Sequence, residues 1–141
     1  MGISKASAQW DGTIKTGKGV MKPAHAPEAP FSLGTRFEGK QGSNPEELIG
    51  AALSGCFSMA LSLGLETAGL KPTRINTAAD VSLEKQGAGF AITTIALTCE
   101  ANVPGTSADQ FQKIADETKK NCPVSKALAG VNITLKASLA R

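Results

Sequence analysis

The chain has 141 residues, the usual length of one domain, and its 41% apolar and 19% charged residues are typical of a folded globular protein. A net charge of +3 and a supply of only five Phe, one Trp and no Tyr argue against nucleic-acid binding. We expect a single domain over residues 1–141 that folds without a metal or disulfide staple.

The three cysteines are Cys56, Cys99 and Cys122, an odd number at wide spacings. This pattern argues against a disulfide scaffold, and without a CxxC or Cys/His cluster it predicts no zinc site and no metal. The chain begins without an apolar signal core, so we expect a cytoplasmic protein.

The first forty residues are rich in glycine and proline and predict a small antiparallel meander. Short strand-like runs cover residues 6–10 and 13–15, and Asp11-Gly12 is a hairpin signal. The one histidine, His25, lies in the proline-rich loop between residues 23 and 30.

The strongest helix signal follows, because Asn44 can cap a helix, Pro45 suits its first position, and Glu46 and Glu47 favour its positive end. We expect this helix to run to about Thr67.

Residues 48–65 form an uncharged stretch, the lower length limit for a membrane span. Glycines and serines dilute this stretch, and no basic anchor flanks it closely. We therefore interpret the helix as central, buried inside a soluble protein or between two subunits, with no membrane contact.

The rest of the chain alternates strand and helix signals. Strand-like runs at residues 75–85 and 90–101 precede a helix that begins near Ser107. A short turn of helix then follows the break at Cys122-Pro123, and a strand at 131–139 closes the chain. This order predicts an α+β fold.

The cysteines differ in what their positions predict. Cys56 lies in the middle of a helix, where a buried structural thiol is the commoner case, and a reactive Cys56 would need a neighbouring cation. Cys122 lies at the start of a short helix, where amide groups lower a thiol's pKa, so its position fits a functional and a structural role equally. Cys99, on the apolar side of a strand pattern, is a core residue.

Four segments together resemble the OsmC/Ohr family of osmotically induced and organic hydroperoxide resistance proteins. They are Thr35–Gly39 (TRFEG), Asn44–Ala52 (NPEELIGAA), Cys56–Leu61 (CFSMAL) and Asn121–Ser125 (NCPVS). The resemblance extends over the whole chain, and the TRFEG segment favours the OsmC branch.

The resemblance implies an intertwined homodimer with antiparallel sheets around a long buried central helix and active sites at the interface. It implies that Cys56 attacks a peroxide and that Cys122 resolves the sulfenic acid as a disulfide. It also implies that Arg36 stabilises the thiolate and that Glu46 is the acid that orients it. An external dithiol would reduce the disulfide, and no cofactor is expected.

Helix geometry favours Glu46 over Glu47, because Glu46 projects about 80° from Cys56 and Glu47 about 180°. Ten residues of helix nevertheless rise about 15 Å, too far for direct contact. Either Arg36 bridges this gap, or Glu46 serves the Cys56 of the partner chain.

Other interpretations are weaker. A redox-sensing or binding protein would use the same two thiols, whereas a cysteine hydrolase would need His25 as its base. Residues 12–19 imitate a phosphate-binding loop, but Gly19 replaces the Ser or Thr that would hold magnesium. Four apolar residues near the predicted site could line a peroxide pocket or belong to the core: Phe31, Phe37, Phe57 and Met59.

Overall fold

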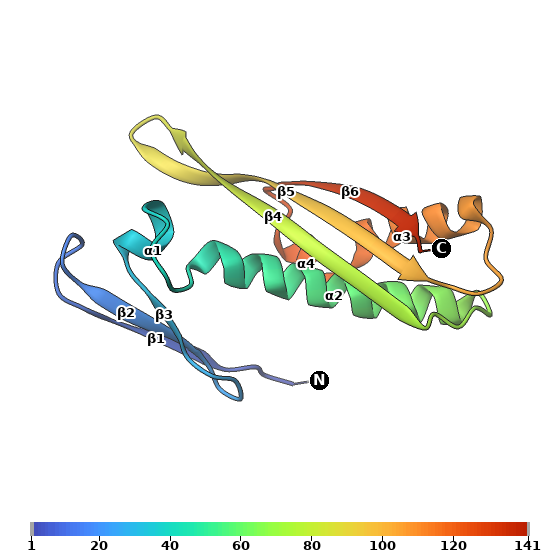
Figure 1. Cartoon of the computed structure of the whole chain (residues 1–141), viewed down its shortest axis with the longest axis horizontal. Helices are drawn as coiled ribbons and strands as arrows, with labels where there is room; N and C mark the ends of the chain where they lie inside the picture. Colours follow the sequence, from blue (N-terminus) through green and yellow to red (C-terminus); the bar gives the residue numbers. More distant parts are fainter. Residues whose placement is uncertain (1, 141) are drawn as a thin grey trace. The chain divides into compact units, whose positions relative to one another are not determined.

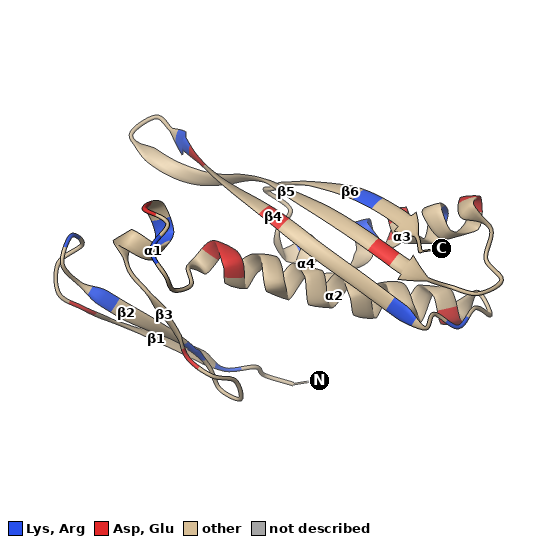
Figure 2. Cartoon of the chain, in the orientation of Figure 1, with Lys and Arg blue, Asp and Glu red and all other residues tan. Residues whose placement is uncertain are grey.

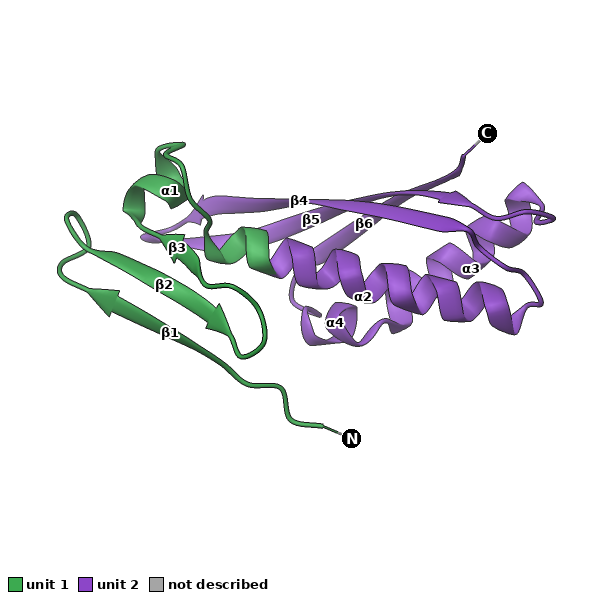
Figure 3. Ribbon diagram, turned by 60° about the horizontal axis from the view of Figure 1, so that its bottom comes forward, with its two compact units in different colours: residues 1–48 green, residues 49–141 purple. Residues whose placement is uncertain are grey.

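The computed structural model describes residues 2–140 and consists of two compact units, residues 1–48 and residues 49–141 (Figure 3). The prediction of one domain is not decided by this division and stays a prediction.

The first unit is an antiparallel sheet in the order β1-β2-β3 followed by a short helix (Figure 1). Its elements are β1 (Ala6–Asp11), β2 (Lys18–Pro23), β3 (Ala29–Phe31) and α1 (Leu33–Phe37). The hairpin predicted at Asp11-Gly12 is confirmed, with Gly12 at a positive φ of 96°. The predicted strand at residues 13–15 is wrong, because Gly17 N–H bonds to Thr13 O and closes a turn there.

The second unit contains a mixed sheet in the order β4-β5-β6. Its elements are β4 (Arg74–Gln86), β5 (Gly89–Asn102), α3 (Ala108–Asn121), α4 (Pro123–Ala127) and β6 (Asn132–Leu139), together with most of α2 (Pro45–Thr67). The fold class, α+β, is confirmed. The expectation of antiparallel pairing throughout is wrong, since β6 runs parallel to β5. The connection through α3 and α4 returns the chain to the end of the sheet at which β5 begins, as a parallel pair requires.

The boundaries of α2 agree with the sequence prediction. The side chain of Asn44 accepts a hydrogen bond from Glu47 N–H at 2.8 Å, as an N-cap residue does. After Thr67, Gly69 adopts a φ of 82°, a left-handed conformation that favours glycine and ends the helix.

One face of the β4-β5-β6 sheet is covered by helices α2, α3 and α4 (Figure 3). The inward residues of β5 are fully buried and include Cys99, so the prediction that Cys99 belongs to the core is confirmed. The helices supply the other side of this core with residues that have at most 2% exposure: Leu53, Phe57, Leu61, Leu65, Phe111, Ala115 and Cys122.

Helix α2 is buried along one face only. Its core stripe repeats every four residues, from Leu53 to Leu65, whereas Met59 is 80% and Leu63 is 66% exposed. Charge is confined to its two ends (Figure 2). By length and hydropathy it could span a membrane, and 28% of its most apolar window is buried within the chain. The stripe packed in the core is what a core helix of a globular protein shows.

Candidate redox site

In the first unit, Arg36 and Glu46 form a forked ion pair. Arg36 Nε donates to both carboxylate oxygens of Glu46 at 3.1 Å, and Arg36 Nη2 also donates to Oε1. The Glu46 side chain is 9% exposed and that of Arg36 is 36% exposed. The pair therefore fixes the guanidinium plane from its buried side and leaves part of the cation exposed.

Helix α1 sets the position of Arg36. Ser32 caps this helix by accepting a hydrogen bond from Thr35 N–H, and Thr35 Oγ1 accepts one from Ser32 N–H in return. Arg36 follows directly in the last turn of α1 and stacks on Phe37, with its guanidinium carbon 5.5 Å from the ring centre. Helix α1 is not among the elements predicted from sequence, because it is too short to show a periodic pattern.

In the second unit, Cys56 and Cys122 are in contact. Their Sγ atoms lie 2.9 Å apart, between the middle of α2 and the N-cap of α4, and both thiols are free. Cys122 is 1% exposed, and Cys56 is partly exposed. Since a disulfide is about 2.05 Å long, only a short movement separates this thiol pair from a disulfide.

The pKa values of the two thiols are shifted in opposite directions. Burial raises the pKa of Cys56, and the hydrogen bond with Cys122 raises it further. Burial also acts to raise the pKa of Cys122, but hydrogen bonds from Cys56 and from Ser125 and Val124 outweigh it, so that pKa is lowered. Either thiol can donate across the contact, and the directions of the two pKa shifts favour a thiolate on Cys122.

The structure thus brings the four predicted residues together as two pairs, one in each unit. Cys122 lies at the start of a short helix, and the pKa of its thiol is lowered, as its position predicted. The groups that act on Cys56 within its unit include no cation. The expectation that a reactive Cys56 has a neighbouring cation therefore stays a prediction.

Only some of the four apolar residues that could line a peroxide pocket are accessible to a substrate. Phe57 is fully buried in the core of the second unit and cannot line an open pocket. Phe31 packs against Trp10 with ring centres 5.5 Å apart, whereas Phe37 and Met59 are exposed.

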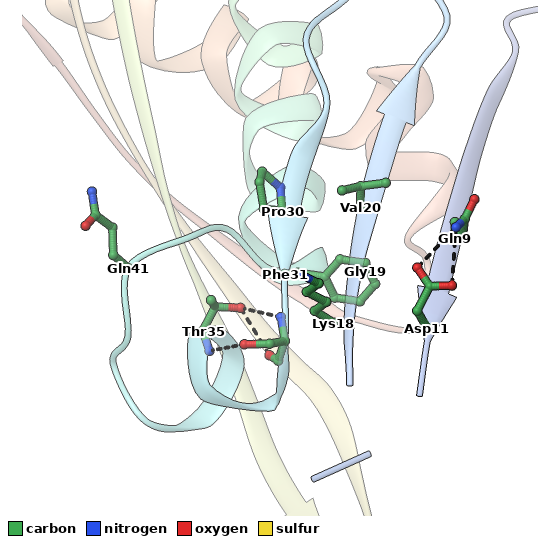
Figure 4. Close-up of a pocket in the computed structure, with 10 residues that line it drawn as sticks. Gln9, Asp11, Lys18, Gly19, Val20, Pro30, Phe31, Thr35 and Gln41 are labelled. Carbon is green, nitrogen blue, oxygen red and sulfur yellow. Dashed lines mark hydrogen bonds between the residues drawn. The ribbon is translucent and has the colours of Figure 1, made fainter. Parts of the chain in front are cut away.

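A hollow of about 400 Å³ lies over the first sheet and contains Phe31 (Figure 4). Gln9 and Asp11 line it and bond to each other, and Thr35 in its wall is bonded to Ser32. None of the four predicted site residues lines this hollow, and it contains no thiol, so it does not supply redox chemistry by itself.

The phosphate-loop interpretation is excluded by position. Residues 12–19 form the β1–β2 turn and the start of β2, so they are not a phosphate-binding loop that opens a helix. His25 is exposed in the β2–β3 connection. Among residues 2–140, no three His, Cys, Asp or Glu side chains come together as metal ligands.

Sequence reasoning overlooked one residue of the thiol pair's surroundings, Ser125. It lies three residues after Cys122, and its hydrogen bonding is among the causes that lower the pKa of that thiol. Its position could have indicated this role, because Ser125 is the third residue of the helix that Cys122 caps.

The chain is similar in sequence and in fold to known proteins. The family model for OsmC-like proteins matches residues 37–136. The chain is 53% identical to peroxiredoxin OsmC of Escherichia coli (strain K12) over 137 residues, covering 96% of this chain and 95% of that protein. It is 30% identical to the organic hydroperoxide resistance protein OhrA of Bacillus subtilis, covering 70% of each chain. An OsmC-like protein of Vibrio cholerae, 16% identical, shares the fold with a TM-score of 0.78 over 97% of this chain and 99% of that one.

Proposed function

Because the chain belongs to the OsmC family, we propose that it is a cysteine-based peroxidase that reduces organic hydroperoxides to alcohols with Cys56 and Cys122. The single observation that carries the residue assignment is the 2.9 Å contact between the two sulfur atoms. The peroxiredoxin relative and the organic hydroperoxide resistance relative indicate the reaction and its substrate class.

In the first step, the Cys56 thiolate attacks the outer oxygen of the hydroperoxide. A sulfur–oxygen bond forms, the oxygen–oxygen bond breaks, and the alcohol leaves once it has gained a proton. In the second step, the Cys122 thiolate attacks the sulfur of the Cys56 sulfenic acid. The disulfide bond forms, the sulfur–oxygen bond breaks, and the departing hydroxide takes a proton and leaves as water. The contact between the two sulfurs supports this order, since Cys122 needs no rearrangement of the chain to reach Cys56.

Cys56 is the assigned nucleophile, yet burial raises the pKa of its thiol. A cation beside Cys56 would oppose this shift and favour the Cys56 thiolate. Arg36 is our candidate, because its guanidinium is always charged and Glu46 holds its plane. In this proposal Glu46 positions Arg36 and does not exchange a proton with the peroxide.

We assign the working form as a homodimer in the cytoplasm. The exposed apolar face of α2, with Met59 at 80% and Leu63 at 66% exposure, supports a partner chain at this helix. An external dithiol recycles the disulfide by thiol–disulfide exchange.

The test is peroxide consumption with a dithiol present, measured with cumene hydroperoxide and hydrogen peroxide for wild type, Cys56→Ser and Cys122→Ser. We expect wild type to turn over and to prefer the organic peroxide. Cys56→Ser should be inactive, and Cys122→Ser should react once and accumulate a sulfenic acid. Equal activity of Cys56→Ser and wild type would refute the assignment, and a single turnover of wild type would indicate a redox sensor instead.

A further inference from the structure

The Ser125 hydroxyl is close enough to the Cys122 thiol to lower the pKa of that thiol, yet it is buried and makes no regular hydrogen bond with any described residue. Ser125 is 7% exposed, and its Oγ makes no hydrogen bond of ordinary geometry in the described structure. A buried hydroxyl without a hydrogen bond destabilises the folded state, so such a group calls for a physical explanation.

The residue that explains this hydroxyl is Cys122, at the start of the same short helix. Cys122 is the N-cap of α4 and Ser125 is its third residue, the spacing at which a side chain approaches the N-cap residue. Figures 1 and 3 show α4 beside α2, the helix that carries Cys56. The sulfur of Cys122 is thus held between the Cys56 sulfur on one side and α4 on the other.

We propose that the Ser125 hydroxyl is a hydrogen-bond donor reserved for the Cys122 thiolate, which it stabilises when that thiolate leaves the Cys56–Cys122 disulfide. This inference rests on the proposed function and adds a third residue to the thiol pair. A neutral thiol is a weak acceptor, whereas a thiolate is a charged one, so the hydroxyl finds its partner only in the ionised state. The lowered pKa of Cys122, to which Ser125 contributes, agrees with this role.

The step that Ser125 serves is reduction of the disulfide. One thiolate of an external dithiol attacks Cys56 Sγ and forms a mixed disulfide, the Cys56–Cys122 bond breaks, and Cys122 leaves with the electron pair as a thiolate. The second thiol of the reductant then attacks the mixed disulfide, which oxidises the reductant and releases Cys56 as a thiolate. A leaving thiol of lower pKa leaves faster, so stabilising Cys122 directs the attack to Cys56.

Ser125→Ala removes the hydroxyl without adding bulk, and Ser125→Thr retains it. Thr118→Val is the matched control, because Thr118 is also 7% exposed and its hydroxyl bonds only to Ile114 O within α3. The first measurement is thiolate absorbance against pH in the Cys56→Ser background, which reports Cys122 without any need for peroxidase activity. We expect Ser125→Ala to raise the pKa of Cys122 by about one unit, and Ser125→Thr and Thr118→Val to leave it nearly unchanged.

The second measurement is the rate at which dithiothreitol reduces the oxidised protein that has both cysteines. We expect Ser125→Ala to slow this rate roughly threefold to tenfold, with peroxide-driven oxidation of Cys56 less affected. If Ser125→Ala only raises the melting temperature, and leaves both the thiolate titration and the reduction rate unchanged, the hydroxyl is a plain unpaired group and the proposal fails. That failure would leave the peroxidase assignment intact, because the assignment depends on turnover by wild type.

Discussion

Arg36 and Glu46 form the forked ion pair of the first unit, with Arg36 Nε 3.1 Å from each carboxylate oxygen. The carboxylate is the more buried partner, at 9% side-chain exposure against 36% for the arginine. A cation held in this way keeps one orientation, and the proposed reaction needs an oriented cation near the Cys56 thiolate.

Glu46→Gln tests this orientation. The amide keeps the shape of the side chain but loses the charge-assisted fork, so we expect kcat/KM for an organic hydroperoxide to fall about tenfold to a hundredfold. Glu47→Gln is the matched control, because Glu47 is the next residue of α2 and is exposed. The measurement is the initial rate of peroxide loss. Equal rates for the two variants would show that Glu46 does not contribute to the site.

Mixed dimers test which chain's Glu46 serves Cys56. About 15 Å of helix rise lies between these residues in one chain, so we expect Glu46 to act on the partner's Cys56. Cys56→Ser and Glu46→Gln chains, unfolded and refolded together at equal amounts, should then recover about a quarter of wild-type activity, since half of the dimers carry one intact site. No recovery in dimers shown to be mixed would place both groups in one chain.

Leu63→Glu tests the exposed face of α2. Leu63 is 66% exposed in the single chain, and a carboxylate there would be buried without a partner if the face meets a second chain. We expect the dimer dissociation constant, measured by sedimentation, to rise at least about tenfold. Glu66→Gln, one turn along the same helix, serves as the control. An unchanged constant for Leu63→Glu would exclude this face as the interface.

The pH dependence of stability tests the core thiol Cys99. Burial raises the pKa of Cys99 above its ordinary value of 9.0. The unfolded chain therefore releases this proton first, and the stability held below pH 9 is lost as pH rises towards the folded pKa. We expect Cys99→Val to flatten the fall in melting temperature above pH 9. An equally steep fall in the variant would assign the loss to other groups.

Local signals predict most of the elements of this fold. Asn44-Pro45 gives the start of α2, Asp11-Gly12 gives the first hairpin, and the alternation along 95–101 gives the buried face of β5. The parallel pairing of β6 could not be predicted, because it depends on which strand the chain meets after α3 and α4. The strand expected at residues 13–15 is absent because a turn closed by the Gly17 N–H and Thr13 O hydrogen bond occupies that segment.

The site could be predicted only in part. The position of Cys122 before Pro123 indicates a thiol with a lowered pKa, whereas nothing local distinguishes Cys56 from a core residue. Its contact with Cys122 joins residues 66 positions apart, which no local pattern predicts, and the family resemblance alone pointed to the pair. Ser125 was overlooked because a serine in a short helix has many ordinary roles.

The most direct test of the peroxidase account is disulfide mapping after one equivalent of cumene hydroperoxide. The fully reduced protein is oxidised, its remaining thiols are alkylated, and its peptides are identified by mass without reduction. The account predicts a Cys56–Cys122 disulfide, one alkylated Cys99, and one alcohol formed for each disulfide. Cys56 recovered as an alkylated thiol, or a disulfide that involves Cys99, would contradict it.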